Sequence, residues 1–257
     1  MSIGWNPWHG CKKFSTGCEH CYVYRQDEMY GAKNSSEVRK NTAQFDLPLK
    51  LNRNKSYKIQ SGQMVYTCFT SDFFVEEADE WRIQAWKMMK IRKDLRFFFF
   101  TKRVDRFSVS LPDDWGGGYE NVIIGCSVEN QETADYRLPI FEKLPIRHKL
   151  IIVAPMLEKM DISPYLNEKI SEVSVSGESG KDGRIFDYDW ALDIRRQCVE
   201  KEVSFEFHQT GAKFLKDGKL YRIRRCHQLS QAQKAGIDYK LDCDLWEDFD
   251  EETPKLF

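Results

Sequence analysis

Three cysteines near the amino terminus are the residues whose types and spacing most clearly suggest chemistry. Cys11, Cys18 and Cys21 form a C-x6-C-x2-C pattern within eleven residues. Three thiolates are one ligand short of a closed tetrahedral zinc site, which His9 or His20 could complete. On a 4Fe-4S cluster the same three thiolates leave one iron free to bind a substrate or cofactor. The pattern therefore predicts an iron–sulfur site or a zinc site.

Glycines directly precede the first two of these cysteines, at Gly10 and Gly17. Glycine tolerates a positive φ and a close backbone approach, so we expect both positions to help the thiols converge. The other cysteines of the chain are widely scattered. They are Cys68, Cys126, Cys198, Cys226 and Cys243. We interpret them as small buried apolar residues rather than as a disulfide framework.

Six short apolar runs recur along the rest of the chain at intervals of roughly 23 to 32 residues, the length of a strand–helix unit. The runs are 64–69, 97–100, 122–126, 150–154, 173–176 and 203–207. Most are continuously apolar, as is typical of strands that are covered on both faces in a parallel sheet. The series predicts an α/β fold, a partial (β/α)6-type TIM-like barrel, with a doubly wound open sheet as the competing topology.

Amphipathic spacing predicts helices between these runs, over 76–93 and over 187–201 behind an Asp187 N-cap. Residues 131–143 predict a helix that is interrupted near Pro139. We therefore expect a barrel domain over 1–212, with a long loop or insertion at about 34–63. A C-terminal extension with short helices at best and an acidic tail follows over 213–257.

Polar motifs follow five of the six apolar runs. They are Thr70-Ser71-Asp72, Thr101-Lys102-Arg103, Ser127-Val128-Glu129-Asn130, Gly177-Glu178-Ser179-Gly180 and His208-Gln209-Thr210-Gly211. In a parallel barrel the carboxyl ends of all strands lie at one face, which is where active sites are built. The five motifs therefore predict a polar rim close to the segment 10–21, which holds Cys11, Cys18 and Cys21 and is called the cysteine loop below.

Taken together, these motifs resemble an uncharacterised, phage-associated family of radical S-adenosylmethionine type that is distantly similar to spore photoproduct lyase. The matching blocks include Trp5-Asn6-Pro7, the three cysteines, Ser71-Asp72-Phe73-Phe74, Thr101-Lys102-Arg103, Gly125-Cys126-Ser127-Val128-Glu129-Asn130, Pro155-Met156-Leu157, Gly177-Glu178-Ser179-Gly180, and Gln209 with Gly211. The resemblance implies a 4Fe-4S cluster on Cys11, Cys18 and Cys21. It also implies an enzyme that reductively cleaves S-adenosylmethionine to give a 5′-deoxyadenosyl radical.

The resemblance also directs attention to the residues that would bind the cofactor. They are His20, Asp72, Lys102, Arg103, Ser127 and Glu129. We expect His20 near the adenine, and Asp72 and Glu129 at the ammonium or ribose hydroxyls. Lys102 and Arg103 would meet the carboxylate, where charge-assisted hydrogen bonds are strongest.

Glu178, His208 and Gln209 lie late in the barrel order, and we expect them to face the substrate as catalytic residues. The resemblance implies a one-electron reductant of flavodoxin or ferredoxin type. A nucleic acid or nucleotide is the expected substrate class, contacted through the basic segment 33–58; a peptide or small metabolite remains open, as does an ordinary solvated surface for that segment. The charge distribution agrees with such a contact, since residues 1–110 carry a net charge of +7 and residues 111–257 one of −8.

Two other function classes remain open on sequence grounds. One is a non-enzymatic binding module that zinc stabilises at the same cysteines. The other is a hydrolase or nuclease that holds a divalent metal ion with Asp72, Glu129 and Glu178.

The composition sets the protein class. A hydrophobic content of 41% is enough for a full core and excludes wholesale disorder. No apolar stretch approaches the roughly 20 residues that cross a bilayer, and the first residues lack the pattern of a secretory signal. We therefore expect a cytoplasmic protein without a membrane partner.

Overall fold

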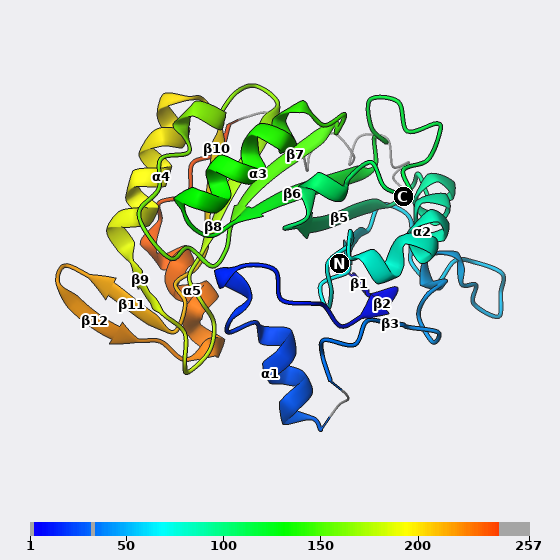
Figure 1. Ribbon diagram of the computed structural model, residues 1–257, viewed down its shortest axis with the longest axis horizontal. Coiled ribbons are helices and arrows are strands. Elements are labelled where there is room, and N and C mark those ends of the chain that lie inside the picture. Colours follow the sequence, from blue (N-terminus) through cyan, green and yellow to red (C-terminus); the bar gives the residue numbers. More distant parts are fainter. Residues whose placement is uncertain (1–2, 32–33, 242–257) are drawn as a thin grey trace.

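The computed structural model describes residues 3–31 and 34–241. Within these ranges, seven parallel strands form one sheet that curls into a half-barrel (Figure 1). In order across the sheet they are β1 (Ile3–Trp5), β4 (Met64–Thr67), β5 (Arg96–Thr101), β6 (Val122–Val128), β7 (His148–Val153), β8 (Ile170–Ser176) and β10 (Ser204–Gln209). Every neighbouring pair in this order is parallel.

Strand positions and strand order confirm the predicted partial barrel. All six apolar runs are strands of the large sheet, and they lie in chain order. The doubly wound alternative is wrong, because its strand order would reverse at a switch point. Strand β1 was not predicted, since three residues are too few to form an apolar run. It extends the sheet by pairing Gly4 with Tyr66 of β4.

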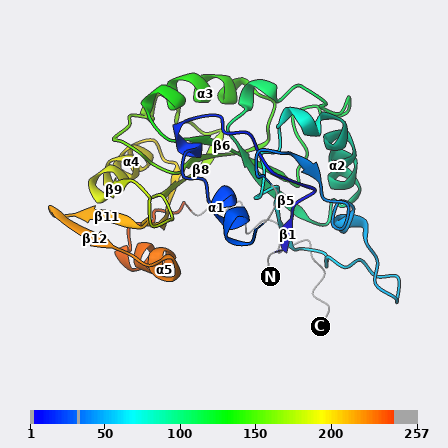
Figure 2. The same cartoon turned by 60° about the horizontal axis from the view of Figure 1, so that its bottom comes forward.

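The described residues form five α-helices on the two sides of the curled sheet. They are α1 (Tyr22–Met29), α2 (Asp79–Ile91), α3 (Gln131–Lys143), α4 (Tyr188–Glu200) and α5 (Arg225–Ala235). Figure 2 shows α2, α3 and α4 on the convex side, whereas α1 lies on the concave side. The predicted cap of α4 is confirmed, since the Asp187 side chain accepts a hydrogen bond from the N–H of Asp189. Across the described residues, no helix combines the length and the apolar character that a membrane span requires.

Helix α3 continues through Pro139, so the predicted interruption is wrong. A capping box starts the helix, in which Asn130 and Thr133 bond to each other's backbone. Leu138 and Phe141, on either side of the proline, are buried in the core. Packing and capping therefore outweigh the one backbone hydrogen bond that proline removes.

Shorter strands lie outside the large sheet. They are β2 (Trp8–His9), β3 (Arg39–Lys40), β9 (Ile185–Asp187), β11 (Lys213–Lys216) and β12 (Lys219–Arg222). Strands β2 and β3 are antiparallel partners, and β11 pairs with both β12 and β9.

The expectation of only short helices after residue 212 is wrong, because a β-hairpin and the eleven-residue helix α5 follow. Their pairing with β9 and packing on β10 stabilise elements that carry little local signal. The segment 34–63 is mainly irregular structure, with β3 and a 3-10 helix at Leu47–Leu49. The domain division at residue 212 stays a prediction, and the acidic tail lies outside the described residues.

The core lies between the convex face of the sheet and the helices. Phe97 and Phe99 of β5 point into it, and Phe99 stacks on Phe73 at a ring distance of 4.1 Å. Phe98 and Phe100 belong instead to a smaller apolar cluster around Ile123, Leu150 and Ile152. The four consecutive phenylalanines therefore serve two different surfaces of one strand, because side chains alternate along it.

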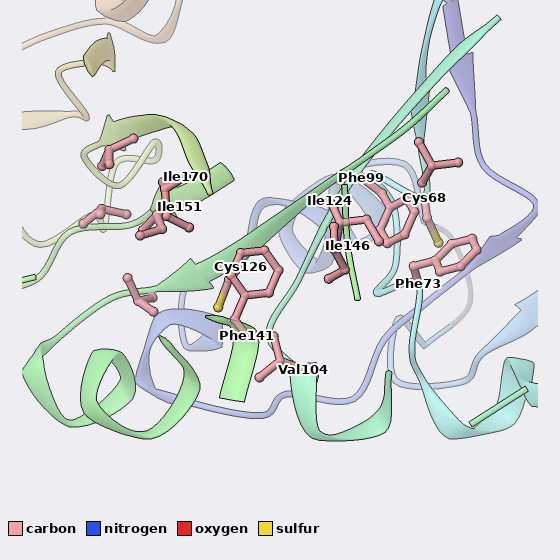
Figure 3. Packing of buried hydrophobic residues seen from close by; sticks show 14 of the residues in the cluster. Cys68, Phe73, Phe99, Val104, Ile124, Cys126, Phe141, Ile146, Ile151 and Ile170 are labelled. Carbon is pink, nitrogen blue, oxygen red and sulfur yellow. The ribbon is translucent and has the colours of Figure 1, made fainter. Parts of the chain in front are cut away.

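Three of the scattered cysteines behave as predicted. Cys68, Cys126 and Cys198 are buried, and Figure 3 shows the sulfur atoms of the first two among the core side chains. Burial raises the pKa of Cys126 to about 12, as expected of an inert core thiol. The same prediction is wrong for Cys226, which is exposed on α5. Cys243 lies outside the described residues.

Candidate functional site

The cysteine loop crosses the concave side of the half-barrel before the chain enters α1 (Figure 2). Cys11 follows β2, Cys18 ends a 3-10 helix at Thr16–Cys18, and Cys21 directly precedes α1. All three are half-buried, and none forms a disulfide. The loop therefore presents three free thiols on the side of the sheet that the outer helices leave open.

Backbone contacts from three segments fix Cys11. Its N–H donates to the carbonyl of Ser35 at 2.8 Å, and its own carbonyl accepts from the Tyr24 hydroxyl of α1. The preceding Gly10 donates its N–H to Thr70 at 3.1 Å, just beyond β4. The first cysteine is thus tied to the barrel and to α1.

Both predicted glycines meet close neighbours. Gly10 has a φ of +90°, and a Cβ there would lie 2.4 Å from the Glu37 carbonyl oxygen. At Gly17 a Cβ would lie 3.0 Å from the Glu129 side chain. A larger residue at either position would push the cysteine loop away from what it packs against.

Opposing influences act on the thiols. Burial raises the pKa of Cys11 to about 12, while the Arg103 guanidinium, 3.7 Å from its sulfur, acts in the other direction. Burial also raises the pKa of Cys21, against hydrogen bonds from the N–H groups of Val23 and Tyr24 at the start of α1. These donors favour the thiolate form that a metal ligand must adopt.

Cys11, Cys18 and Cys21 are the kind of ligands that a three-thiolate metal centre needs. Their sulfur atoms, however, do not converge on one metal position in this structure. Cys18 interacts electrostatically with both Cys11 and Cys21. Among residues 3–31 and 34–241, however, no group of three His, Cys, Asp or Glu side chains is close enough to hold a metal ion. Binding a cluster therefore requires the loop to close further around it. The three thiols are present on one loop, and their binding of a cluster stays a prediction.

The strand ends of β4, β5 and β6, together with their polar motifs, are called the early rim below. Here Asp72 is buried and bonded on both oxygens. It accepts hydrogen bonds from the Thr101 hydroxyl at 2.7 Å, from the Lys102 N–H at 3.0 Å and from the Phe74 N–H at 2.9 Å. The Arg103 guanidinium lies 3.1 Å away. These contacts join the end of β4 to the end of β5.

Glu129, at the end of β6, has no exposed side-chain surface. One oxygen contacts Lys102 at 3.1 Å and Arg137 of α3 at 2.8 Å. The other accepts from the Ser15 hydroxyl and from the N–H of Gly17 at 3.4 Å. Burial alone would raise the pKa of Glu129, but the two cations hold it below its usual 4.5. This carboxylate therefore anchors the cysteine loop between its first two cysteines.

The cofactor-binding roles expected for Asp72 and Glu129 stay predictions. Both carboxylates would have to exchange present partners to reach a ligand. Ser127 is buried, and its carbonyl accepts a hydrogen bond from Arg137 at 2.8 Å. Lys102 keeps part of its side chain exposed.

The strand ends of β8 and β10 are called the late rim. Its buried carboxylate, Glu178, forms a two-pronged contact with Arg184 at 3.0 and 2.8 Å. Burial tends to raise the pKa of Glu178, and Arg184 lowers it below the usual value. The same arginine also reaches the cysteine loop, at the Thr16 carbonyl and the Glu19 side chain.

Helix α1 docks onto the late rim through Arg25. Its guanidinium donates to the Ser179 carbonyl at 2.7 Å. A Cβ at Gly180 would overlap this guanidinium, at 1.1 Å from a nitrogen. Glycine at 180 is therefore the residue that admits the arginine.

The other two predicted substrate-facing residues are held more loosely. His208 is exposed, and its closest acidic partner is Glu206 at 3.5 Å. The hydrogen bond to Glu206 raises the pKa of His208. Gln209 donates to the Gly177 carbonyl at 3.0 Å and accepts from Arg225 at 3.2 Å. The late rim therefore combines one firm carboxylate with side chains open to solvent.

His20 is half-buried and lines a cavity of about 390 Å³ beside α1. Cys21, Arg25 and Lys13 line the same cavity. The other predicted cofactor-binding residues lie elsewhere on the rim. The described residues therefore do not gather all the predicted site residues in one pocket.

Comparisons with known proteins place the chain in a family. The model of a family described as "Protein of unknown function (DUF5131)" matches residues 1–250. The chain belongs to this family. No curated protein matches the sequence.

Two solved structures are similar to this family member. One is a mutant of spore photoproduct lyase, with 13% identity, a TM-score of 0.47, and coverage of 88% of this chain and 69% of that chain. The other is a second mutant of that enzyme with dinucleoside spore photoproduct, with 14% identity, a TM-score of 0.46, and coverage of 90% and 71%. The phage association stays a prediction.

Sequence reasoning missed the residues that hold the site together. Ser15 and Arg137 reach Glu129 from opposite sides, and Arg184 pairs with Glu178. Asp27 of α1 binds His9 at 2.8 Å and accepts a hydrogen bond from the Ser35 hydroxyl at 2.5 Å. His9 lies two residues before Cys11, and the Ser35 carbonyl accepts the N–H of Cys11. One signal was available, because Arg137 is a charged residue on the apolar side of a predicted helix.

The three carboxylates of the hydrolase alternative do not form a shared metal site in the described part of the chain. Asp72, Glu129 and Glu178 each pair with a different arginine. An oxygen-ligand site would need carboxylates that converge on one ion, so this arrangement offers that alternative no support.

Proposed function

We propose that this protein is a radical S-adenosylmethionine enzyme in which Cys11, Cys18 and Cys21 hold a 4Fe-4S cluster. The observation that carries the proposal is the cysteine loop itself. Three free, half-buried thiols lie on a loop that is anchored to the early rim through Glu129 and to α1 through Tyr24. Three thiolate ligands suit a cluster with one open iron.

When bound, such a cluster supplies the electron that cleaves the sulfonium of S-adenosylmethionine into methionine and a 5′-deoxyadenosyl radical. The chain's own residues would position the reactants. Arg103 contacts the sulfur of Cys11 and the carbonyl of Lys12, which suits a cation that stabilises a thiolate ligand. Lys102 is the residue that we assign to the cofactor carboxylate, because its side chain is partly exposed at the early rim.

We assign the substrate to the late rim, where His208 is exposed and Glu178 is held by Arg184. The proposed substrate class is a nucleic acid or nucleotide, and the proposed electron donor is a flavodoxin- or ferredoxin-type protein. Arg53, Lys55 and Lys58 are exposed in the basic segment 33–58, which supports its proposed role as a contact surface for a polyanion.

Anaerobic reconstitution with iron and sulfide tests the proposal. We expect about four iron atoms per chain, a brown colour that bleaches on reduction, and 5′-deoxyadenosine when S-adenosylmethionine and a reductant are added. Cys18→Ala and Cys21→Ala should lose both the iron and the product. Cys226→Ala is the matched control, because this cysteine is exposed on α5 outside the loop, and it should keep both.

A different metal result would favour the zinc alternative. A colourless protein with one zinc per chain, which Cys21→Ala loses and iron and sulfide do not displace, would indicate a zinc-stabilised binding module. Reconstituted iron without any 5′-deoxyadenosine would contradict the enzyme while leaving the cluster in place.

A further inference from the structure

A second cavity lies under the β11–β12 hairpin, away from the residues assigned to the cluster. Its volume is about 270 Å³, and side chains of β11, β12, α5 and the first turn of α4 line it. Pockets for drug-sized ligands measure about 300–1,000 Å³. At slightly below this range, the cavity suits a small ligand.

Aromatic rings form one wall of this cavity. Tyr188 of α4 packs against Phe214 of β11 at a ring distance of 5.6 Å, and Tyr221 of β12 completes the wall. Tyr221 is 40% exposed, and the Lys219 ammonium lies 5.1 Å from the centre of its ring, so a ligand would use the part of the ring that Lys219 leaves open. Such flat apolar faces are surfaces on which nucleic-acid bases stack.

Two lysines line the same cavity, Lys216 from β11 and Lys234 from α5. Neither forms a salt bridge with a carboxylate of the described residues, and the Lys216 ammonium lies 5.0 Å above the Tyr188 ring. The surrounding segment 213–225 contains six Lys and Arg residues and one Asp. Two unpaired ammonium groups within a cationic surface suit an anion with more than one negative charge, as in a phosphate monoester.

Uncharged polar groups complete the lining. Thr210 and Gln231 line the cavity; the Thr210 hydroxyl donates to the Gly211 carbonyl at 3.0 Å, and Gln231 is exposed. Such groups can pair with the edge of a base or with ribose hydroxyls. Thr210 also directly follows Gln209 at the end of β10, so the cavity adjoins the late rim.

From this lining we propose that the cavity binds a nucleoside phosphate. Its base would stack on the exposed Tyr221 ring beside the buried Tyr188 and Phe214 rings, and its phosphate would bind Lys216 and Lys234. The same chemistry is offered by a free mononucleotide and by one nucleotide of a single strand. The site goes beyond the proposed radical chemistry and does not depend on the cysteines.

Titration of the full chain, as purified and without reductant or S-adenosylmethionine, tests this site. Calorimetry with AMP, adenosine and inorganic phosphate compares the whole ligand with its two parts. We expect AMP to bind at least about tenfold more tightly than either part, because both halves of the cavity contribute. An AMP affinity no higher than that of phosphate would overturn the proposal.

Charge reversal locates the binding. Lys216→Glu and Lys234→Glu should each weaken AMP binding by about tenfold or more, through loss of a charge-assisted hydrogen bond. Lys87→Glu is the matched control, because Lys87 is exposed on α2 and makes the same charge change elsewhere. Equal weakening by Lys87→Glu would show a non-specific charge effect and overturn the site.

A ring variant checks the other half of the site. Tyr221→Ala should weaken AMP and adenosine alike while leaving phosphate binding unchanged. Lys234 and Tyr221 are solvent-exposed, so these variants keep the test valid even if Lys216→Glu fails to fold.

The two sources of the ligand are distinguished by a short fluorescein-labelled oligothymidylate. If it binds at least about tenfold more tightly than dTMP, with an affinity that falls steeply with salt, the site takes a nucleotide within a strand. Equal affinities identify the free mononucleotide. Because every measurement is made without the cluster chemistry, failure here leaves the radical proposal standing, and the reverse also holds.

Discussion

The early and late rims of the half-barrel hold their carboxylates in different ways. On the early rim, Glu129 is fully buried and contacts two cations and the cysteine loop. On the late rim, Glu178 is paired with a single arginine that is itself partly exposed, and His208 lies in solvent. The partners of Glu129 come from three segments: Lys102 follows β5, Arg137 belongs to α3, and Gly17 lies in the cysteine loop. Glu178 instead pairs with one residue close in the chain, Arg184.

The difference indicates that the two rims have different structural roles. A buried carboxylate with several cationic partners fixes the segments that carry them, so the early rim sets the position of the cysteine loop. The Glu178–Arg184 pair is easier to rearrange, because Arg184 is partly exposed and solvent can replace a lost partner of its guanidinium. The late rim is therefore the side that can adapt to a substrate.

Removing the charge of Glu129 should have the largest effect. Glu129→Gln leaves Arg137 and Lys102 without their buried counter-ion, which should lower the free energy of unfolding by about 3–5 kcal/mol. Urea denaturation measures the loss, with Glu168→Gln, at an exposed glutamate, as the control within about 0.5 kcal/mol of wild type. A loss as small as that of the control would show that the early rim is not the firmer one.

The same pair predicts a pH dependence. The folded-state pKa of Glu129 lies below the usual 4.5, so its ionised form stabilises the protein above that pH. This stabilisation is lost as the pH falls through the folded-state pKa. The difference in unfolding free energy between wild type and Glu129→Gln should therefore narrow below pH 4.5, which thermal unfolding at stepwise lower pH can follow.

Lys102→Ala tests whether the early rim also binds the cofactor. It removes one partner of Glu129 and the group assigned to the cofactor carboxylate. We expect S-adenosylmethionine binding to the reconstituted protein to weaken by about 1.5–3 kcal/mol. Calorimetry measures the affinity, and an unchanged value would remove Lys102 from the cofactor site.

Glu178→Gln should cost less than Glu129→Gln. Arg184 keeps its contacts with the Thr16 carbonyl and Glu19, and solvent reaches it. We expect a loss of about 1–2 kcal/mol in unfolding free energy, since one charge-assisted contact is weakened at a partly exposed site. A loss that matches Glu129→Gln would abolish the contrast between the two rims.

The smallest effect is expected at His208. Its pKa is raised by Glu206, so any stabilisation is present in full below the usual 6.5 and is lost as the pH rises through the folded-state pKa. His208→Ala should destabilise by about 0.5 kcal/mol or less, because the pair is half-exposed. The effect should be measurable at pH 6 and absent at pH 9, and the reverse trend would contradict the pairing with Glu206.

The sequence by itself determined the strands and the polar motifs of the rim. Continuous apolar runs such as 122–126 are local signals of burial, and they marked all six predicted strands. The cap at Asp187 was legible for the same reason, since it depends on neighbours within one turn. Parallel strands then put their carboxyl ends at one edge, which is why residues as distant as Asp72 and Glu178 were expected on the same rim.

Only the tertiary structure decided which groups meet there. The contact between Ser15 and Glu129 spans 114 residues, and no local pattern encodes it. The same holds for β1, whose three residues become a strand only by pairing with β4, and for the hairpin that pairs with β9. Periodicity along a chain reports which residues are buried, whereas the partners of a buried charge depend on how distant segments pack.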